Sequence, residues 1–544
     1  MPVSRVGDYR PREGGLGPTA RTRRWRGLPS GSRSALAFRG ILRYTTFVEN
    51  GSEIVVVGAG NAALCAALAA AESGCTVRVL ERAPRAEAGG NTAFTAGAMR
   101  VAYRGLDDIR TLVPDLTDEQ IANTDFGTYT EDDFYHDLAR VSEYRTDPEL
   151  ASLLVSRSFD TMRWMKSHGV RFLPIYGRQA YRVDGRYKFW GGLTLEAVGG
   201  GPGLVESLTR AAVSAGIRID YQTRAVALEV EDGRVVGVTV SRGGRRSFLP
   251  AKAVILACGG FQANVAWRTR YLGPGWDLAK VRGTRFNTGD GLQMALAIGA
   301  MPWGNWSGAH AVGWDMNAPP FGDLAVGDGF QKHSYPLGIM VNAHGQRFVD
   351  EGEDFRNYTY AKYGKVILNQ PGQFAWQIFD KKVTPLLRDE YRIRQVTKVR
   401  ADSLEELARK LDGVSTEGFL REVTAYNAAV NQSIPFDPNV KDGRGTVGLA
   451  INKTNWANTI DTPPYEAYGT TCGITFTFGG LRITPDAQVL DTDGEVIPGL
   501  YAAGELVGGI FYFNYPGGSG LMSGSVFGRI AGRHAASTIV EQPE

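Results

Sequence analysis

The chain contains 544 residues, of which 43% are hydrophobic and 22% charged, and its formal net charge is +3. This composition is typical of a globular protein with room for two or more domains. The small net charge argues against nucleic acid or a membrane surface as a partner. No apolar run is long enough for a transmembrane helix. Four scattered cysteines without a CxxC pair exclude a disulfide framework and predict reduced thiols in a cytoplasmic protein.

The first 47 residues differ in composition from the rest. They are rich in Arg, Gly, Ser and Pro and nearly free of acids, and no apolar core of a secretory signal follows the arginines. We expect a disordered extension, or even a wrongly assigned start with Val48 as the true first residue. N-terminal mass spectrometry of the native protein tests this, because a peptide from residues 1–40 would refute the wrong start.

The segment 53–82 predicts a nucleotide-binding unit. An apolar strand (54–57) is followed by the turn Gly58-Ala-Gly60, an alanine-rich helix, and a second strand (76–80) that ends at Glu81. Gly58 permits a tight turn, Gly60 allows backbone to approach phosphate, and the helix N-terminus offers free N–H groups. Glu81 is placed to accept hydrogen bonds from both hydroxyls of an adenosine ribose. The segment therefore predicts a dinucleotide without identifying it.

The remaining elements predict an α/β fold in which one domain is made from both chain ends. Residues 148–168 have helical spacing, and 216–257 alternate as a β-meander that returns to a buried strand. Residues 305–477 lack the repeated glycine turns of the preceding segments. We therefore predict an α+β capping domain over 305–477, inserted into a Rossmann-like domain formed by 48–304 and 478–544. A cofactor domain made in this way favours flavin over nicotinamide, because an isoalloxazine needs contacts beyond the nucleotide half.

Several motifs, taken together, resemble a known family. The chain is similar to the FAD-binding flavoproteins of the fumarate reductase and succinate dehydrogenase superfamily in its segments Glu81-Arg82, GGNT (89–92), LACGGF (256–261), TGDG (288–291), RFVDE (347–351), GLYAAGE (499–505) and VFGRIAG (526–532). They follow the family's order from residue 53 onward. The resemblance implies FAD as the cofactor.

The resemblance also implies which residues hold the cofactor. The turn would hold the pyrophosphate, Glu81 the adenosine ribose and Glu505 the ribityl chain, and the backbone of 519–521 would face flavin N1 and O2. The full set of implied cofactor residues is Gly58, Gly60, Asn61, Ala62, Glu81, Arg82, Gly90, Asn91, Thr92, Gly97, Val226, Gly259, Asp290, Glu505, Ser519 and Leu521. Because the loop after the double glycine contains no histidine, the resemblance implies non-covalent FAD.

The catalytic positions match the family only in part. Arg356 corresponds to the arginine that donates a proton in fumarate reductases, although its spacing from RFVDE is one residue longer. His310 corresponds to a substrate-binding histidine. Two other family residues are replaced, a histidine by Phe476 and a carboxylate-binding arginine by Tyr515. Fumarate reduction in its usual form is therefore not favoured.

Other segments resemble particular branches of the family. NAALCAALAA, GNWSGAH, DFRNYTYAKYG (354–364) and FYFNYPGGSGL are similar to FAD-dependent tricarballylate dehydrogenases, which form cis-aconitate. The Tyr-Pro-Gly sequence is also similar to flavin ketosteroid dehydrogenases, so a ketone desaturase is the alternative. Reduction of an unsaturated acid and a flavin-binding module without catalysis stay open as well.

The expected chemistry is α,β-dehydrogenation of a polycarboxylate. A base removes the proton α to a carboxylate while the β-hydride passes to flavin N5. Arg356 and His310 would bind carboxylates, and Arg356, Tyr515, Tyr358 and Tyr360 are candidate proton carriers. Packing is the favoured role for Tyr358 and Tyr360, and Arg100 is a further candidate on the substrate side. Since the chain contains no haem or iron–sulfur ligands, the family implies a separate electron-transfer partner, possibly membrane-associated.

Overall fold

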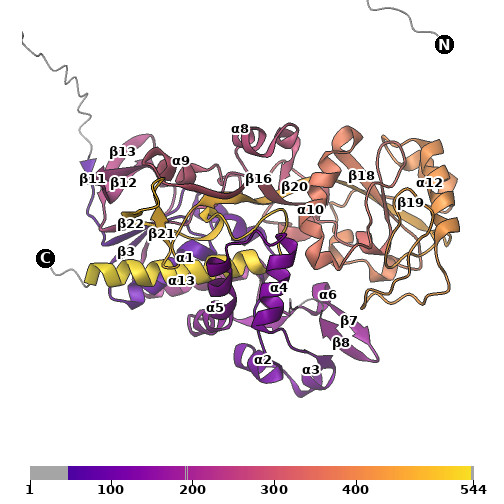
Figure 1. Ribbon diagram of the computed structural model, residues 1–544, viewed down its shortest axis with the longest axis horizontal. Helices are drawn as coiled ribbons and strands as arrows, with labels where there is room; N and C mark the ends of the chain where they lie inside the picture. Colours follow the sequence, from indigo (N-terminus) through magenta and orange to yellow (C-terminus); the bar gives the residue numbers. More distant parts are fainter. Residues whose placement is uncertain (1–46, 190–191, 193, 541–544) are drawn as a thin grey trace, which may run out of the picture. The chain divides into compact units, whose positions relative to one another are not determined.

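The computed structural model describes residues 47–540 except residues 190, 191 and 193. These residues belong to one compact unit, which spans Thr46–Glu544 (Figure 1). The expected disordered extension lies outside the described residues, apart from Phe47. That residue opens strand β1 (Phe47–Val48), which pairs with β13 (Arg245–Pro250).

A six-stranded sheet forms the centre of the expected nucleotide-binding domain. Its strand order is β10 (Arg218–Asp220), β3 (Val77–Leu80), β2 (Ile54–Val57), β14 (Ala253–Leu256), β22 (Val496–Ala502) and β21 (Gln488–Leu490). All neighbours are parallel except β21. Strands β2, β3 and β14 are fully buried, which explains the uninterrupted apolar sequences of β2 and β14. The one charged residue of β3, Arg78, is paired with Glu49 and Asp220. Segments from both chain ends therefore share one sheet, as the sequence predicts.

Two helices from opposite ends of the chain pack closely beside this sheet. They are α1 (Asn61–Glu72) and α13 (Ser519–Val540), drawn in indigo and yellow in Figure 1. A Cβ added at Gly528 would lie 2.4 Å from the carbonyl oxygen of Ala62, and one at Gly532 would lie 2.2 Å from that of Ala66. Only glycine allows the two backbones to approach this closely.

A four-stranded sheet carries the predicted meander. Its order is β1, β13, β12 (Arg234–Arg242) and β11 (Arg224–Glu231). Asp232 and Gly233, which join β11 to β12, both have positive φ, as do Gly243 and Gly244 at the next turn. Positive φ at both central residues is the geometry of a tight hairpin, so the two predicted turns are confirmed.

Residues from the middle of the chain build a third sheet around one long strand. The strand is β20 (Tyr465–Leu481), and it pairs with β15 (Lys280–Val281), β16 (Pro302–Asp315), β18 (Phe374–Phe379) and β19 (Lys398–Ala401). Strand β17 (Ile339–Val341) completes the sheet beside β18. Helices α10 (Tyr360–Leu368), α11 (Leu404–Lys410) and α12 (Thr416–Ala429) accompany it. The expected domain limits at 304/305 and 477/478 fall inside β16 and β20, and the division stays a proposal.

The other elements are short or support the first domain. Helix α5 (Pro148–Ser167) starts at the predicted residue, with Asp147 capping the N–H groups of Glu149 and Leu150. The remaining helices are α2 (Leu106–Leu112), α3 (Asp118–Ala122), α4 (Glu131–Val141), α6 (Tyr176–Gln179), α7 (Gly200–Ser214), α8 (Val265–Trp267) and α9 (Asp290–Ala297). Two small sheets consist of β4 (Ala98–Met99), β9 (Leu195–Ala197) and β6 (Phe172–Pro174), and of β5 (Thr124–Asp125), β8 (Arg186–Phe189) and β7 (Ala180–Val183).

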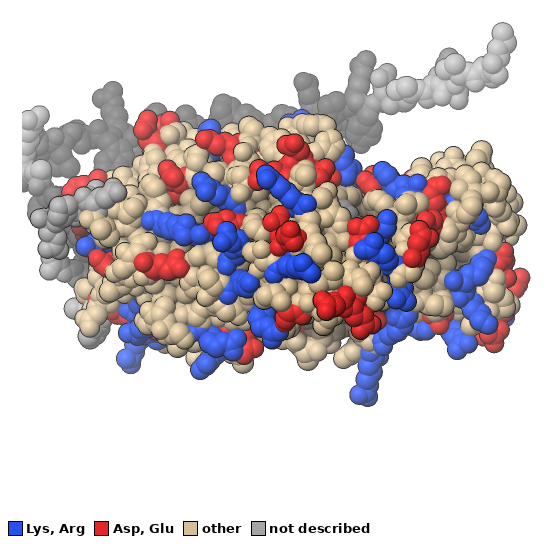
Figure 2. Space-filling view, turned by 90° about the horizontal axis from the view of Figure 1, so that it is seen from below, with Lys and Arg blue, Asp and Glu red and all other residues tan. Residues whose placement is uncertain are grey.

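The charged side chains on the visible face are mixed in sign. Figure 2 shows basic and acidic residues interspersed over that face, in agreement with the small net charge of the chain. Across the described range, no helix is both long and apolar enough to cross a bilayer.

Candidate active site

One large cavity brings together nearly all residues that the sequence predicts for the site. It begins at the carboxyl ends of β2 and β3 and extends to residues of β16, α10 and β20. All three expected catalytic residues line it, and so do all but three of the expected cofactor residues. Ligands of open α/β sheets bind at the carboxyl ends of the strands, so this is the expected place.

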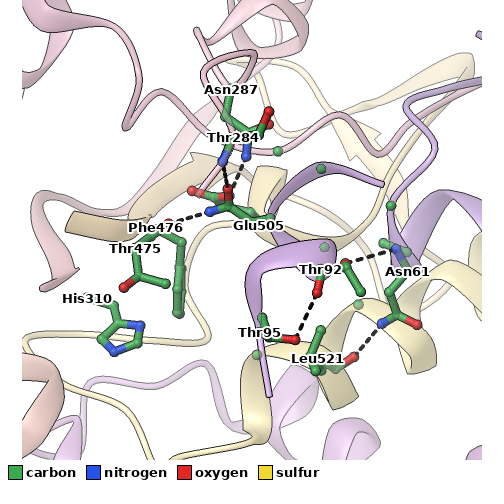
Figure 3. A pocket seen from close by; sticks show the side chains of 18 of the residues that line it. Asn61, Thr92, Thr95, Thr284, Asn287, His310, Thr475, Phe476, Glu505 and Leu521 are labelled. Atoms are coloured by element: carbon green, nitrogen blue, oxygen red, sulfur yellow. Dashed lines mark hydrogen bonds between the residues drawn. The ribbon is translucent and has the colours of Figure 1, made fainter. Parts of the chain in front are cut away.

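The glycine turn at the start of α1 has the backbone geometry that a bound phosphate requires. Gly58 has φ +110°, and a Cβ there would lie 2.4 Å from the carbonyl oxygen of Ala257. The N-cap residue of α1, Gly60, has no side chain to cap the helix. The Asn61 side chain instead donates to Leu521 O at 2.8 Å and to Ser525 Oγ at 2.9 Å, which joins the starts of α1 and α13 (Figure 3). Two helix N-termini thus meet at the cavity, where their dipoles favour an anion.

Glu81 directly follows β3 and lines the cavity. Its carboxylate accepts hydrogen bonds from the backbone N–H groups of Ala59 at 3.0 Å and Ala83 at 2.7 Å. Burial raises the pKa of Glu81, and these backbone donors act in the opposite direction. The two bonds fix the carboxylate at the end of the strand, where a ribose is expected.

Asp290 lines the cavity, but its carboxylate is already engaged. Arg224 donates to both oxygens, at 2.7 and 2.8 Å, and Arg82 donates at 3.0 Å. Thr288 also donates, at 3.0 Å. Asp290 therefore holds two arginines beside the cavity, and Arg224 is a lining residue that the sequence reasoning missed.

Glu505 connects the end of β22 to β20. It follows β22 in the short helix η11 (Gly504–Leu506) and accepts a hydrogen bond from the Thr477 N–H at 2.8 Å. The side-chain amides of Gln262 and Asn287 donate at 3.3 and 3.4 Å. Figure 3 shows Asn287 beside Glu505. Burial raises the pKa of Glu505 to about 7. The protonated acid can donate as well as accept, which suits contact with a hydroxylated chain.

Asn91 and Thr92 bridge segments around the cavity. The Asn91 amide donates to Thr475 O at 2.5 Å and accepts from the Thr284 N–H at 3.0 Å. Thr92 Oγ1 accepts from the Asn61 N–H at 3.1 Å. The GGNT loop is therefore tied both to the first turn of α1 and to β20.

The far end of the cavity contains a cluster of aromatic and imidazole rings. The hydroxyls of Tyr360 and Tyr515 are hydrogen-bonded at 2.6 Å. The centroid of the His310 ring lies 5.0, 4.7 and 5.3 Å from the ring centroids of Tyr360, Tyr515 and Phe476, respectively. Neither nitrogen of His310 has a hydrogen-bond partner among the described residues. Burial, and secondarily Arg282, lowers the pKa of His310 well below its usual range, so the ring is neutral.

Arg356 lies at the same end, in the short helix η7 (Arg356–Tyr358). The preceding RFVDE segment is fixed by a buried ion pair between Arg347 and Glu351 at 2.6 Å. The Arg356 guanidinium is 3.4 Å from His333 Nδ1. Burial, followed by the charge of Arg388, lowers the pKa of Arg356 to about 10. An arginine with this pKa exchanges a proton more readily than an exposed one.

Four charged residues of this end were missed by the sequence reasoning: Arg282, Asp328, Arg388 and Glu390. Arg282 is paired with Asp328 at 2.6 Å and donates to Thr475. These residues come from three separate segments, since Arg388 and Glu390 both belong to the region of the short helix η10 (Asp389–Tyr391), and none belongs to a periodic pattern or a recognised motif. Only the fold brings them together.

Three expected cofactor residues lie off the cavity. Gly97 has φ +73°, and a Cβ there would be 2.6 Å from the backbone of Gly200, so it serves a close backbone contact. Val226 lies beside an irregularity in the pairing of β11, and its neighbour Ala225 lines the cavity instead. The Ser519 hydroxyl donates to Pro516 O at 2.5 Å, and Leu521 lines the cavity.

Two further candidates also lie elsewhere. Arg100 is fully buried, and it donates to Gly517 O at 2.8 Å and to the Tyr129 hydroxyl at 2.7 Å. Tyr358 donates to Asp137 at 2.6 Å. Neither lines the large cavity. Arg100 supports the 517 turn, and the packing role favoured for Tyr358 stays a prediction. Tyr360, by contrast, does line the cavity.

Comparison with known proteins matches most of the chain. A family model described as "FAD binding domain" matches residues 53–521. A probable fumarate reductase of Shewanella frigidimarina is 31% identical over 90% of this chain and 76% of its own length. A 4-oxocyclohexanecarboxylate 2-dehydrogenase of Sinomonas cyclohexanicum is 28% identical over 89% of this chain and 92% of its own length. The open conformation of a flavocytochrome c3 fumarate reductase covers 90% of this chain and 78% of its own with a TM-score of 0.66 and 28% identity.

Proposed function

Because the chain belongs to the FAD binding domain family, we propose that this flavin-dependent oxidoreductase dehydrogenates a saturated polycarboxylate, specifically tricarballylate to cis-aconitate. The observation that carries this proposal is the position of Arg356 and His310 at the far end of the cavity whose other end is the nucleotide cradle. FAD fits this cradle, since Gly58, the N-terminus of α1 and Glu81 supply a phosphate site and a ribose site.

The bound flavin supplies a two-electron acceptor, and the residues at the far end bind and orient the substrate. Arg356 holds a carboxylate through its two-pronged guanidinium. Neutral His310 offers one N–H donor to a second oxygen, and because neither ring nitrogen has a hydrogen-bond partner in the described part of the chain it is available for this. The rings of Phe476, Tyr360 and Tyr515 exclude water around it.

We assign proton transfer to Arg356. Burial raises the pKa values of Tyr360 and Tyr515, whereas it lowers that of Arg356, because burial disfavours the charged form in each case. With a pKa of about 10, roughly one Arg356 in a thousand is neutral at pH 7. That neutral form accepts the proton α to the carboxylate, and the protonated form returns it in the reverse reaction.

This assignment predicts a pH dependence. The neutral, active fraction of Arg356 grows as pH rises toward its pKa of about 10. The rate of flavin reduction at saturating substrate is therefore expected to increase about tenfold per pH unit between pH 7 and pH 9. Stopped-flow absorbance under anaerobic conditions measures this rate, and a profile that is flat over these two units would contradict the role of Arg356 as base.

A ketone substrate is the alternative, and the Tyr360–Tyr515 pair favours it. Two phenols hydrogen-bonded at 2.6 Å beside the aromatic ring of Phe476 are suited to a carbonyl oxygen on an apolar ligand. The similarity to a dehydrogenase named for 4-oxocyclohexanecarboxylate supports the same reading. Reduction of an unsaturated acid, as the name of the Shewanella relative suggests, is the reverse direction of the same chemistry.

Anaerobic mixing of the holoenzyme with candidate substrates distinguishes these proposals. Tricarballylate is expected to bleach the flavin absorbance at the rate of turnover. Bleaching by a cyclic ketone or a ketosteroid but not by tricarballylate would overturn the preferred substrate. If no candidate bleaches the flavin but fumarate reoxidises the reduced enzyme, the protein would be a reductase of unsaturated acids, which is the opposite of the proposed direction. In each case we propose a separate electron-transfer protein as the partner that exchanges electrons with the flavin.

A further inference from the structure

Arg388 is a buried arginine at the edge of the active-site cavity. It directly precedes the short helix η10 (Asp389–Tyr391), and its backbone N–H donates to Ser334 Oγ at 3.2 Å. Its side chain is 8% exposed. Arg388 and Arg356 both line the large cavity and also a smaller one beside Trp456. The two guanidiniums therefore belong to the same wall.

Within the described residues, the Arg388 side chain makes no hydrogen bond and no ion pair, which sets it apart. The other buried arginines have acceptors on carboxylates, carbonyls or ring atoms: Arg78, Arg100, Arg268, Arg282, Arg347, Arg356 and Arg529. A guanidinium that lines a cavity without a protein partner can bind an anion that a ligand supplies.

The neighbours of Arg388 do not supply that anion. Arg356 is a second cation, and repulsion from Arg388 contributes to its lowered pKa. Glu390 lines the same cavity, but no oxygen of it is within 4.0 Å of an Arg388 nitrogen, and its Oε1 has no hydrogen-bond partner in the described part of the chain. Lys332 donates to the backbone carbonyl of Glu390 and lies near Asp315. Arg356 and Arg388 thus face one cavity, and Glu390, which also lines it, forms no ion pair with Arg388 within the described residues.

We propose that Arg388 binds a second carboxylate of the substrate, while Arg356 holds the carboxylate next to the reacting carbons. Arg388 would then be the residue that selects dicarboxylates and tricarboxylates over monocarboxylates and simple ketones. This inference rests on the proposed function, because it assigns a further substrate group to the same site. A planar guanidinium binds a carboxylate by two parallel hydrogen bonds, which Gln cannot reproduce and Lys reproduces only as a point charge.

The test compares ligands that differ in their number of carboxylates. Crotonate, fumarate and cis-aconitate are added to oxidised holoenzyme, and binding is followed by the change in flavin absorbance, which needs no turnover. In Arg388→Gln the Kd for fumarate and cis-aconitate is expected to rise roughly 10- to 100-fold, and the Kd for crotonate by less than about threefold. Arg388→Lys is expected to fall between the wild type and Arg388→Gln.

Arg392→Gln is the matched control. Arg392 lies four residues further on, is 52% exposed and pairs with exposed Asp389 at 3.3 Å, so its replacement is expected to leave all three affinities unchanged. Thermal unfolding of each holoenzyme shows whether the fold is retained. Equal Kd values in wild type and Arg388→Gln, or an equal loss for all three ligands, would overturn the role of Arg388 alone. Failure of the wild type to bind any of them would overturn the proposed function and this inference together.

Discussion

Replacing Arg356 with Gln is expected to lower the rate of substrate-driven flavin reduction by roughly a thousandfold or more, while FAD remains bound. Two contributions are lost together. A proton carrier contributes on the order of 10²–10⁴ in rate, and a positioned cation that stabilises developing charge contributes a comparable factor. The two factors do not multiply fully, because one side chain supplies both. Anaerobic stopped-flow absorbance at saturating substrate measures the loss.

Arg356→Lys is the informative companion variant. This variant keeps a positive charge near His333 but loses the paired N–H donors of the guanidinium. Compared with Arg356→Gln, it is expected to recover part of the substrate affinity and little of the rate of flavin reduction. The flavin spectrum and the thermal unfolding midpoint are expected to stay close to wild type in both variants. A rate of flavin reduction unchanged in Arg356→Gln would remove the assigned role and favour a protein that holds flavin without catalysing this reaction.

Replacing Gly58 with Ala is expected to abolish stable FAD binding. The φ of +110° is unfavourable for any L side chain, and the new Cβ would lie 2.4 Å from the backbone oxygen of Ala257. Backbone cannot move aside as a side chain does, so the turn must shift away from the pyrophosphate. We expect an FAD affinity at least about 100-fold lower and a loss of roughly 2–4 kcal/mol in the free energy of unfolding.

Gly216→Ala separates the two causes. Gly216 has φ +77°, but a Cβ there meets no atom within 4 Å. This variant is expected to lose only about 1–2 kcal/mol and to keep FAD, because it carries the backbone cost without the clash. FAD content is measured as flavin released into solution by denaturation, which also tests the proposed non-covalent attachment. Full FAD occupancy in Gly58→Ala would contradict the phosphate role of the turn.

The cofactor end of the cavity was predictable from sequence because its chemistry is local. A strand, a glycine turn, a helix and an acid within thirty residues determine their own geometry, and Gly58 and Glu81 lie where that pattern places them. Val226 shows the limit of this reasoning. Side chains of a strand alternate between its two faces, and the pairing of β11 is irregular between residues 225 and 227. Ala225, and not Val226, lines the cavity.

The substrate end depends on contacts between distant segments, and for this reason the sequence predicted it only in part. Arg356 and His310 were found through a family motif. Arg388 and Arg282 belong to no motif. Their different roles can be recognised only when the residues around each of them in the fold are known. Arg282 is neutralised by Asp328, whereas Arg388 has no such partner in the described structure. The role of Asp290 changed for the same reason, since its two arginines come from β11 and the end of β3.

The contact between α1 and α13 has a consequence for the order of events during synthesis. Asn61 of the first helix bonds to Leu521 and Ser525 of the last, and the phosphate cradle lies where the two helices start. A ribosome makes the first half of this pocket more than 450 residues before the second. The growing polypeptide therefore has no complete site for FAD until the start of α13 has emerged, and cofactor capture has to follow that point.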